Sequence, residues 1–204
     1  MSFWENTRKP VGLGEKMMVF LMNVGHRALA DWGLRYALLP EGAAILDCGC
    51  GGGANLARLL QKYPHGRADG IDYSAVSVES SQKLNRKAAD DGRCTILQAS
   101  AAALPFADAQ YDLVTAFETV YFRGNTAQCF REVCRVLKPG GTFLICNECG
   151  GENPKDEKWT EKIDGMTIYS EVQLKAALEE AGFFEIQTYR NQKGWLCVTA
   201  RKSL

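Results

Sequence analysis

The chain has 204 residues, of which 46% are hydrophobic, and it carries 24 basic and 24 acidic side chains. This length fits one domain with at most a small appendage, and the apolar fraction excludes a disordered or fibrous chain. Because the net charge is zero, the chain lacks the overall attraction that drives binding to a phosphate backbone. We therefore do not expect a nucleic acid to be its main partner.

The first positions, MSFWENTRKP, have no apolar run behind their basic residues, and the apolar stretch 17–22 is too short to span a bilayer. The eight cysteines are interpreted as reduced thiols, because a chain with a full core does not need disulfides. We therefore expect a cytoplasmic protein with no membrane span.

Residues 17–39 are apolar at helical spacing, which predicts two helices parted near residues 23–25, and Pro40 and Gly42 then break the chain. Beyond this point short apolar strands alternate with amphipathic helices. The predicted strands are 43–48, 67–72, 94–98, 111–117 and 142–147, and the predicted helices are 54–62, 74–89, 126–137 and 171–181. Residues 138–141 are read as breakers after a helix, and the polar residues 150–165 predict a surface loop.

The last segment, 183–202, alternates apolar and polar residues and predicts an antiparallel hairpin that turns at residues 191–194. Strands that alternate with helices imply a parallel sheet with helices on both faces. The hairpin brings the total to seven strands. The sequence therefore predicts an α/β fold around one mostly parallel sheet.

The stretch ILDCGCGGG, residues 45–53, ends the first strand and leads into the helix 54–62. Glycine at positions 49, 51 and 53 permits positive φ and lets a ligand touch the backbone. The N–H groups of the helix start favour a negatively charged ligand group. In an open α/β sheet the ligand crevice lies at this end of the strands.

The glycine pattern by itself is ambiguous. Gly49-x-Gly51-x-x-Ala54 also matches the dinucleotide fingerprint, so a nicotinamide cofactor is an alternative, and a tight turn that binds nothing is another. Asp47 argues against a pyrophosphate at this helix end, because like charges repel. It favours a ligand that carries both an ammonium and a carboxylate. The alternative role for Asp47 is to hold nearby loop amides.

Asp72 ends the second predicted strand, in GIDYS. A carboxylate at this place can accept hydrogen bonds from both ribose hydroxyls of a nucleoside and disfavours a 2′-phosphate. Tyr73 follows, and an aromatic ring here can pack against a purine. The alternative for Asp72 is an N-cap on the next helix, a role that Ser74 can fill instead.

Four ordered segments, ILDCGCGGG, GIDYS, ASAAALPFADAQYDLVTAFETVYF and EVCRVLKPGGTFLICNE, together resemble a class I S-adenosylmethionine-dependent methyltransferase of the ubiquinone/menaquinone-biosynthesis type. The resemblance covers residues 41–204. It implies a Rossmann-like methyltransferase domain over these residues and S-adenosyl-L-methionine as cofactor. It also implies that residues 1–40 form an N-terminal helical cap over the substrate.

Carried over position by position, the resemblance assigns the methionine portion of the cofactor to Asp47 and the glycine loop, and the ribose to Asp72. Tyr73 is then placed against the adenine, Ser100 and Ala101 at the adenine edge, and Phe117 beside the sulfonium. Many relatives have an acid at the place of Ser100, whose hydroxyl is a weaker acceptor. The candidate cofactor-binding residues are Asp47, Gly49, Cys50, Gly51, Asp72, Tyr73, Ser100, Ala101 and Phe117.

Methyl transfer from a sulfonium is an in-line displacement, so the protein mainly aligns the acceptor and keeps water away. A base is needed only where the acceptor must lose a proton. The candidate catalytic residues are Glu118, Tyr121 and His26. Their alternatives are a cap or surface acid, a pocket wall, and a polar residue on a helix face, respectively. Asn147 and Glu148 end the fifth predicted strand and point to the same rim.

Two further patterns are not assigned to chemistry. Cys146-x-x-Cys149 lacks a second ligand pair at zinc-binding spacing, so we expect no metal site there or elsewhere. Tyr189-x-x-x-Lys193 matches the catalytic pair of short-chain dehydrogenases, but that pair needs a helical turn, and here it falls at a strand end.

We therefore expect a methyltransferase for a small or medium-sized acceptor; the alternatives are an NAD-dependent oxidoreductase and a non-catalytic S-adenosylmethionine-binding module. Phe117-Glu118-Thr119 differs from the Asn/Asp-Pro-Pro-aromatic signature of base or glutamine methylation. Quinone-ring, other small-molecule, thiol and metalloid acceptors remain alternatives. The aromatic residues of the predicted cap either line an apolar acceptor site or pack the cap onto the sheet. They are Phe3, Trp4, Phe20, Trp32 and Tyr36.

Overall fold

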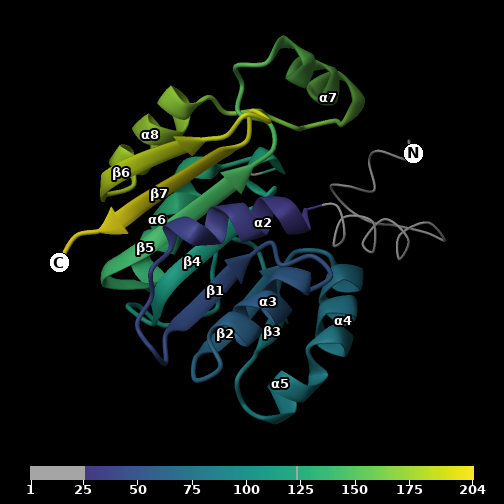
Figure 1. Cartoon of the computed structure of the whole chain (residues 1–204), viewed down its shortest axis with the longest axis vertical. Coiled ribbons are helices and arrows are strands. Elements are labelled where there is room, and N and C mark those ends of the chain that lie inside the picture. The colour runs from purple at the N-terminus through teal and green to yellow at the C-terminus, as the bar shows by residue number, and fades with distance from the viewer. Residues whose placement is uncertain (1–25, 123) are drawn as a thin grey trace.

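The computed structural model describes residues 26–122 and 124–204. Seven strands in this part of the chain form one sheet in the order β3-β2-β1-β4-β5-β7-β6 (Figure 1). The strands are β1 Ala44–Cys48, β2 Arg67–Asp72, β3 Ile96–Gln98, β4 Tyr111–Phe117, β5 Leu137–Asn147, β6 Phe183–Arg190 and β7 Leu196–Lys202. The first five are parallel, and β7 is antiparallel to both β5 and β6. The predicted Rossmann-like sheet with a closing antiparallel hairpin is confirmed.

Helices cover both faces of this sheet. The helices are α2 Arg27–Gly33, α3 Ala54–Lys62, α4 Ala75–Leu84, α5 Arg86–Asp90, α6 Thr126–Val136, α7 Glu157–Lys162 and α8 Glu171–Glu180, with 3-10 turns η2 Leu34–Tyr36, η3 Val120–Phe122 and η4 Pro154–Asp156. Apolar residues of α2, α3 and α4 join one core cluster, and those of α6 and α8 join the other. The sheet is therefore the middle of three layers (Figure 1).

Alternation along the central strands builds these two cores. In β4, Leu113 and Phe117 face the cluster under α2 and α3, while Val114 and Ala116 face the cluster under α6. All four side chains are buried, as expected for a parallel strand covered on both faces. The strand order reverses between β1 and β4, because β2 and β3 continue to one side and β5 to the other. Such a switch point opens a crevice at the carboxyl ends of the strands.

Three predicted boundaries are wrong for identifiable reasons. The helix predicted over residues 74–89 breaks at Asn85, whose side-chain amide donates to the carbonyls of Gly53 and Ser81. Strand β5 begins at Leu137 and not at residue 142, so residues 138–141, which follow the helix as predicted, already belong to the strand, whose pairing with β4 shifts register there. The predicted loop 150–165 contains α7, in which Glu157 opens the helix and Lys162 closes it, as the helix dipole favours.

The described part of the predicted cap lies on the sheet. Leu29 and Ala30 of α2 are buried in the core, and a Cβ at Gly33 would lie 2.8 Å from Cys146 Sγ. The ring centroids of Trp32 and Trp195 lie 6.1 Å apart, and Tyr36 stacks on Tyr189 with ring centroids 3.7 Å apart.

These two cap aromatics therefore pack the segment onto the sheet. The other aromatics predicted for the cap lie outside the described residues, and the division at residue 40 stays a prediction. Searched over the described ranges, the chain contains no helix with the length and apolarity that crossing a bilayer requires.

Candidate active site

A cavity of about 450 Å³ opens at the carboxyl ends of the parallel strands. It lies at the switch point between β1 and β4, among the loops that follow β1, β2, β3 and β4. Most of the predicted site residues line it: His26, Gly49, Cys50, Gly51, Asp72, Tyr73, Ser100, Ala101, Phe117 and Glu118. The tertiary structure thus brings together residues from four strand ends and from the start of α2.

The glycine loop folds back onto the end of β2. The N–H groups of Gly49 and Cys50 both donate to the carbonyl of Ile71, at 2.8 and 2.9 Å. Gly49 has φ +89°, and a Cβ there would lie 2.3 Å from Thr119 Cγ2. Gly51 has φ +52°, and a Cβ there would meet no atom within 4 Å. Glycine is therefore needed at 49 for packing, whereas at 51 it keeps the backbone bare beside the cavity.

Asp72 joins the glycine loop to the start of α4. Its Oδ2 accepts from the N–H of Gly51 at 3.0 Å, and its Oδ1 accepts from the N–H of Ser74 at 2.9 Å. Burial raises the pKa of Asp72, against the lowering effect of these hydrogen bonds. The backbone N–H of Tyr73 also hydrogen-bonds this carboxylate, so three of its about four lone-pair positions are occupied and Asp72 keeps the capacity to accept from one hydroxyl in the cavity. Ser74 Oγ accepts from Ser77 N and caps α4, as the sequence suggested.

The β3 side of the cavity carries aromatic and hydroxyl groups. Tyr73 lines it with a ring that is 48% exposed, so a flat apolar group can stack there. Ser100 Oγ accepts from the N–H of Ala102 at 3.2 Å and retains a hydroxyl hydrogen and a second lone pair. Ala101 completes this wall without adding a polar side chain. The arrangement suits a purine better than a charged group.

Asp47 lies beneath the loop and does not belong to the cavity wall. It is 1% exposed, and its Oδ1 accepts from Thr115 Oγ1 on the neighbouring strand at 2.7 Å. This placement suits the role of holding the strand end under the glycine loop. Contact of Asp47 with the ammonium of a ligand, directly or through water, stays a prediction.

At the ends of β4 and β5, three titratable side chains lie close together. One ligand atom from each of His26, Glu118 and Glu148 lies within 4.8 Å of the other two. Glu118 has a left-handed backbone, φ +58°, which costs about 1 kcal/mol for a residue with a Cβ. Burial raises the pKa of Glu118 to about 8, and burial lowers the pKa of His26. The neutral imidazole is therefore favoured near pH 7.

Tyr121 lies behind Glu118 and does not belong to the cavity wall. Its hydroxyl hydrogen has two acceptors at 3.2 Å, Glu118 Oε1 and the carbonyl oxygen of Cys149, and its oxygen accepts from the N–H of Cys149 at 2.8 Å. The backbone N–H of Glu148 also donates to Glu118 Oε1. Burial raises the pKa of Tyr121 far above its usual value, so the phenol stays protonated. Its geometry is that of a residue that positions Glu118.

Sequence reasoning missed several residues of the cavity wall, and two of them also hold its loops in place. Thr119 lines the cavity and supports Gly49, and its hydroxyl donates to the carbonyl of Cys48 at 3.0 Å. Asn125 lines the cavity and caps α6 by accepting from Gln128 N. An asparagine directly before a helical pattern is a sequence signal for such a cap. Thr119 had no comparable signal, because its contact with Gly49 joins two separate strand ends.

The patterns Cys146-x-x-Cys149 and Tyr189-x-x-x-Lys193, to which no chemistry was assigned, do not line the cavity. Cys146 is fully buried in β5 opposite Cys197 of β7. Tyr189 stacks on Tyr36, while the ammonium of Lys193 lies 4.7 Å from the ring centroid of Trp195.

Asn147, at the end of β5, has a fully buried side-chain amide that no described residue hydrogen-bonds. An unpaired buried amide costs about 1–3 kcal/mol, so it favours a polar guest or water nearby.

A family model described as a methyltransferase domain matches residues 39–193. The chain is similar to cycloartenol-C-24-methyltransferase 1 of Oryza sativa subsp. japonica, with 30% identity over 154 residues, 71% of this chain and 44% of the relative. It is also similar to dimethylglycine N-methyltransferase of Parasynechococcus marenigrum (strain WH8102), with 36% identity over 108 residues, 52% of this chain and 38% of the relative. The matches thus span less than half of the length of these relatives.

Among solved structures, the fold is similar to phosphoethanolamine N-methyltransferase 2 of Haemonchus contortus in complex with S-adenosyl-L-methionine. The TM-score is 0.80 at 15% identity, over 100% of this chain and 60% of that chain. At this identity the likeness shows the fold alone. The family model, in contrast, matches well over half of the sequence, and the chain belongs to the methyltransferase domain family.

Proposed function

We propose that this protein is an S-adenosylmethionine-dependent methyltransferase that acts on a small-molecule acceptor by in-line transfer. The observation that carries the proposal is the junction of Asp72 with Gly51 on the wall of the cavity. A carboxylate and a bare glycine backbone lie side by side there, which supports a ligand in which a ribose is joined to an amino acid portion. Membership of the methyltransferase domain family supports this ligand over a nicotinamide dinucleotide.

In this proposal each part of the cofactor is assigned to residues at the end of a different strand. Tyr73, Ser100 and Ala101 take the adenine, Asp72 takes the ribose, and the glycine loop with Cys50 and Asp47 takes the methionine portion. Phe117 borders the sulfonium, which supplies an electrophilic methyl group when the cofactor is bound. Glu118 and His26 face the acceptor, and Tyr121 holds Glu118. The side chains align the acceptor and exclude water, which suffices for a displacement with a good leaving group.

The family does not choose the acceptor. One of the two relatives above is named a carbon methyltransferase and the other a nitrogen methyltransferase, so the atom that receives the methyl group differs between the names of similar chains. The ubiquinone/menaquinone-type branch, a cytoplasmic location and the exclusion of nucleic acid as a partner belong to this proposal as well. Their support is the sequence motifs and the balance of charges.

Isothermal titration calorimetry tests the proposal. We expect S-adenosylhomocysteine and S-adenosylmethionine to bind the full chain with micromolar affinity, and NADH not to bind in the same cell. Absence of binding with millimolar S-adenosylhomocysteine would overturn the proposal. Transfer of a labelled methyl group to any added acceptor separates an enzyme from a module that only binds the cofactor.

A further inference from the structure

His26 and Glu118 line the cavity and lie close to Glu148, and these three side chains, which come from three separate elements, are called the acidic subsite. His26 precedes α2, Glu118 follows β4 and Glu148 follows β5. One side-chain atom of each lies within 4.8 Å of the other two. Neighbouring strands are about 4.8 Å apart, so the ends of β4 and β5 place two carboxylates at one spot.

This subsite adjoins the glycine loop. Strand β4 pairs directly with β1, and Thr119, next to Glu118, supports Gly49 and lines the cavity. His26 and Glu118 line the same cavity as the loop. A group held at the subsite is therefore one strand away from the loop to which the methionine portion of the donor is assigned.

The charge of the subsite is negative when its acids are ionised. The groups that act most strongly on Glu118 are Glu148, Tyr121 and Asp156, and none of these three is a cation. His26 is favoured as the neutral imidazole, because burial lowers its pKa. Lys193 acts on Glu148 from the outer hairpin. Burial raises the pKa of Glu118 to about 8, and a cationic guest favours its ionised form and is stabilised there, whereas a carboxylate or phosphate guest is repelled by the ionised acids.

We propose that the acidic subsite binds the ammonium group of a primary or secondary amine, and that Glu118 takes its proton before methyl transfer. The inference rests on the proposed function and narrows it to nitrogen acceptors. Glu118 suits the role by its orientation, because its Oε1 accepts both from Tyr121 and from the backbone of Glu148. Its Oε2 carries neither of these bonds. Asn147, with its buried amide, lies next to Glu148 in the chain.

Protons and electrons balance in this step. The ammonium gives one proton to the Glu118 carboxylate, which leaves a neutral amine and a carboxylic acid. The nitrogen lone pair then forms the new nitrogen–carbon bond while the sulfur–methyl bond breaks, and that electron pair remains on sulfur as a neutral thioether. The product leaves as a methylated ammonium. The proton on Glu118 is then released to solvent, which restores the carboxylate.

The same three side chains are also a donor set for a divalent cation, since one ligand atom of each lies within 4.8 Å of the other two. This upper bound admits a metal, which holds its ligand atoms up to about 4–5 Å apart, as well as a hydrogen-bonding nitrogen, which bridges acceptors up to about 6 Å apart. Treatment with EDTA and addition of Mg²⁺ or Mn²⁺ therefore distinguish the two guests in the experiment below.

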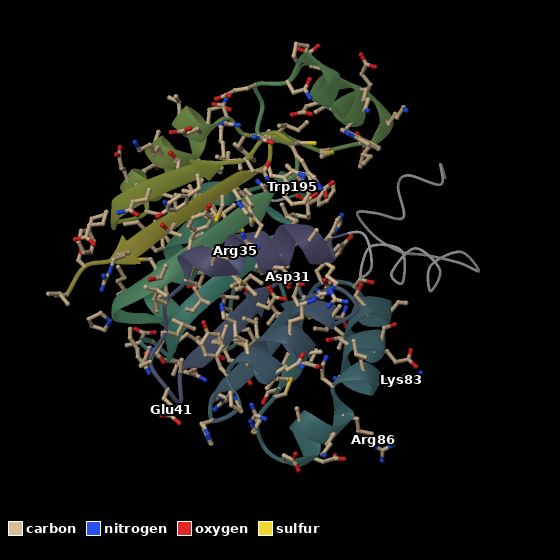
Figure 2. The ribbon with its side chains drawn as sticks, viewed as in Figure 1. Asp31, Arg35, Glu41, Lys83, Arg86 and Trp195 are labelled. Atoms are coloured by element: carbon tan, nitrogen blue, oxygen red, sulfur yellow. The ribbon has the colours of Figure 1, made fainter. Side chains whose placement is uncertain are left out.

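A matched acceptor screen with labelled S-adenosylmethionine tests the inference. Each amine, for example 2-phenylethylamine or its N-methyl derivative, is paired with the alcohol and the thiol of the same carbon skeleton. We expect label on amines and none on their alcohol and thiol partners. Glu118→Gln, which keeps an oxygen for both donors, should reduce kcat/KM on the best amine at least 100-fold while S-adenosylhomocysteine affinity changes less than threefold. Glu41→Gln is the matched control and should act as wild type, because Glu41 (labelled in Figure 2) precedes β1 and does not line the cavity.

Three outcomes overturn the inference without touching the proposed function. These are label on alcohols, thiols or carbon acids but not on amines; activity that EDTA abolishes and Mg²⁺ or Mn²⁺ restores; and full activity of Glu118→Gln. Should Glu118→Gln unfold, Glu148→Gln must reduce kcat/KM on the amine at least tenfold, and wild-type activity overturns the inference. Failure of the wild-type chain to bind S-adenosylhomocysteine instead defeats the proposed function itself.

Discussion

Asp72 is bound to Gly51: the carboxylate Oδ2 at the end of β2 accepts from the backbone N–H of Gly51 in the loop after β1, at 3.0 Å. Two neighbouring strand ends are thereby fixed to one another at the wall of the cavity. The same carboxylate accepts from Ser74 at the start of α4. A single side chain therefore sets the shape of the loop and presents an acceptor to the ligand.

Replacing Asp72 by Asn tests this double role. An amide group can accept at only one of its two termini, so one backbone bond and the negative charge are lost. We expect S-adenosylhomocysteine affinity to fall by about tenfold to 100-fold, or about 1.4–2.8 kcal/mol, measured by calorimetry. Ser74→Ala is the matched control: it removes the cap of α4, should cost about 1 kcal/mol of unfolding free energy, and should leave affinity near wild type. Equal affinity in Asp72→Asn would contradict the assignment.

Two glycine substitutions separate packing from ligand access. Gly49→Ala places a Cβ 2.3 Å from Thr119 Cγ2, whereas Gly51→Ala meets no atom within 4 Å. We expect Gly49→Ala to lower the unfolding free energy by about 2–4 kcal/mol through overpacking and strain. Gly51→Ala should cost only about 1 kcal/mol, for its left-handed backbone, yet weaken S-adenosylhomocysteine binding at least tenfold. Thermal melts with and without S-adenosylhomocysteine measure the stability and the ligand binding of both variants. A larger loss of stability in Gly51→Ala than in Gly49→Ala would refute the separate roles of the two glycines.

The pKa of Glu118 makes stability depend on pH. Burial raises it from about 4.5 to about 8, so between these values the folded chain holds a proton that the unfolded chain has released. The stabilisation that comes from holding this proton is fully present in the unfolding free energy below about pH 4.5, and it is lost as the pH rises through 8. Glu118→Gln removes this dependence. We expect the unfolding free energy of the variant relative to wild type to increase by about 1–3 kcal/mol between pH 5 and pH 9, by urea titration.

Asp72 and Glu148 also have raised pKa values and add stability changes of the same sign to both proteins. The difference between the variant and wild type therefore isolates Glu118. A difference that stays constant from pH 5 to pH 9 would show that the carboxyl group titrates normally.

Tyr121→Phe should shift the catalytic pH profile. The phenol donates to Glu118 Oε1, and this hydrogen bond lowers the pKa of Glu118 against the larger effect of burial. Without it the pKa rises, so the ascending limb of log kcat/KM against pH moves to higher pH. The variant also leaves the N–H of Cys149 without the phenol oxygen, which should cost about 1–3 kcal/mol of stability.

Tyr189→Phe is the control for this substitution, because it keeps the stack on Tyr36 and lies outside the cavity wall. Its pH profile should coincide with that of wild type. A Tyr121→Phe profile that also coincides would show that the phenol does not tune Glu118.

Local patterns determined most of the framework. The bounds of α3, β2 and β4 agree with those predicted from the sequence, because periodicity and breakers act within a few residues. The glycine loop and Asp72 were also identifiable, since a strand, a glycine cluster and a helix follow each other directly. The helix α7 was missed, because its polar, glycine-flanked segment lacks the apolar stripe that sequence patterns detect.

Only the tertiary structure decided which side chains share the cavity. Asp47 and Glu118 both end strands, yet the first is buried against Thr115 and the second lines the cavity. His26, Glu118 and Glu148 meet although long segments separate them in the chain. The order of strands in the sheet brings their ends together, and that order arises from burying both faces at once. No local pattern in the sequence encodes it.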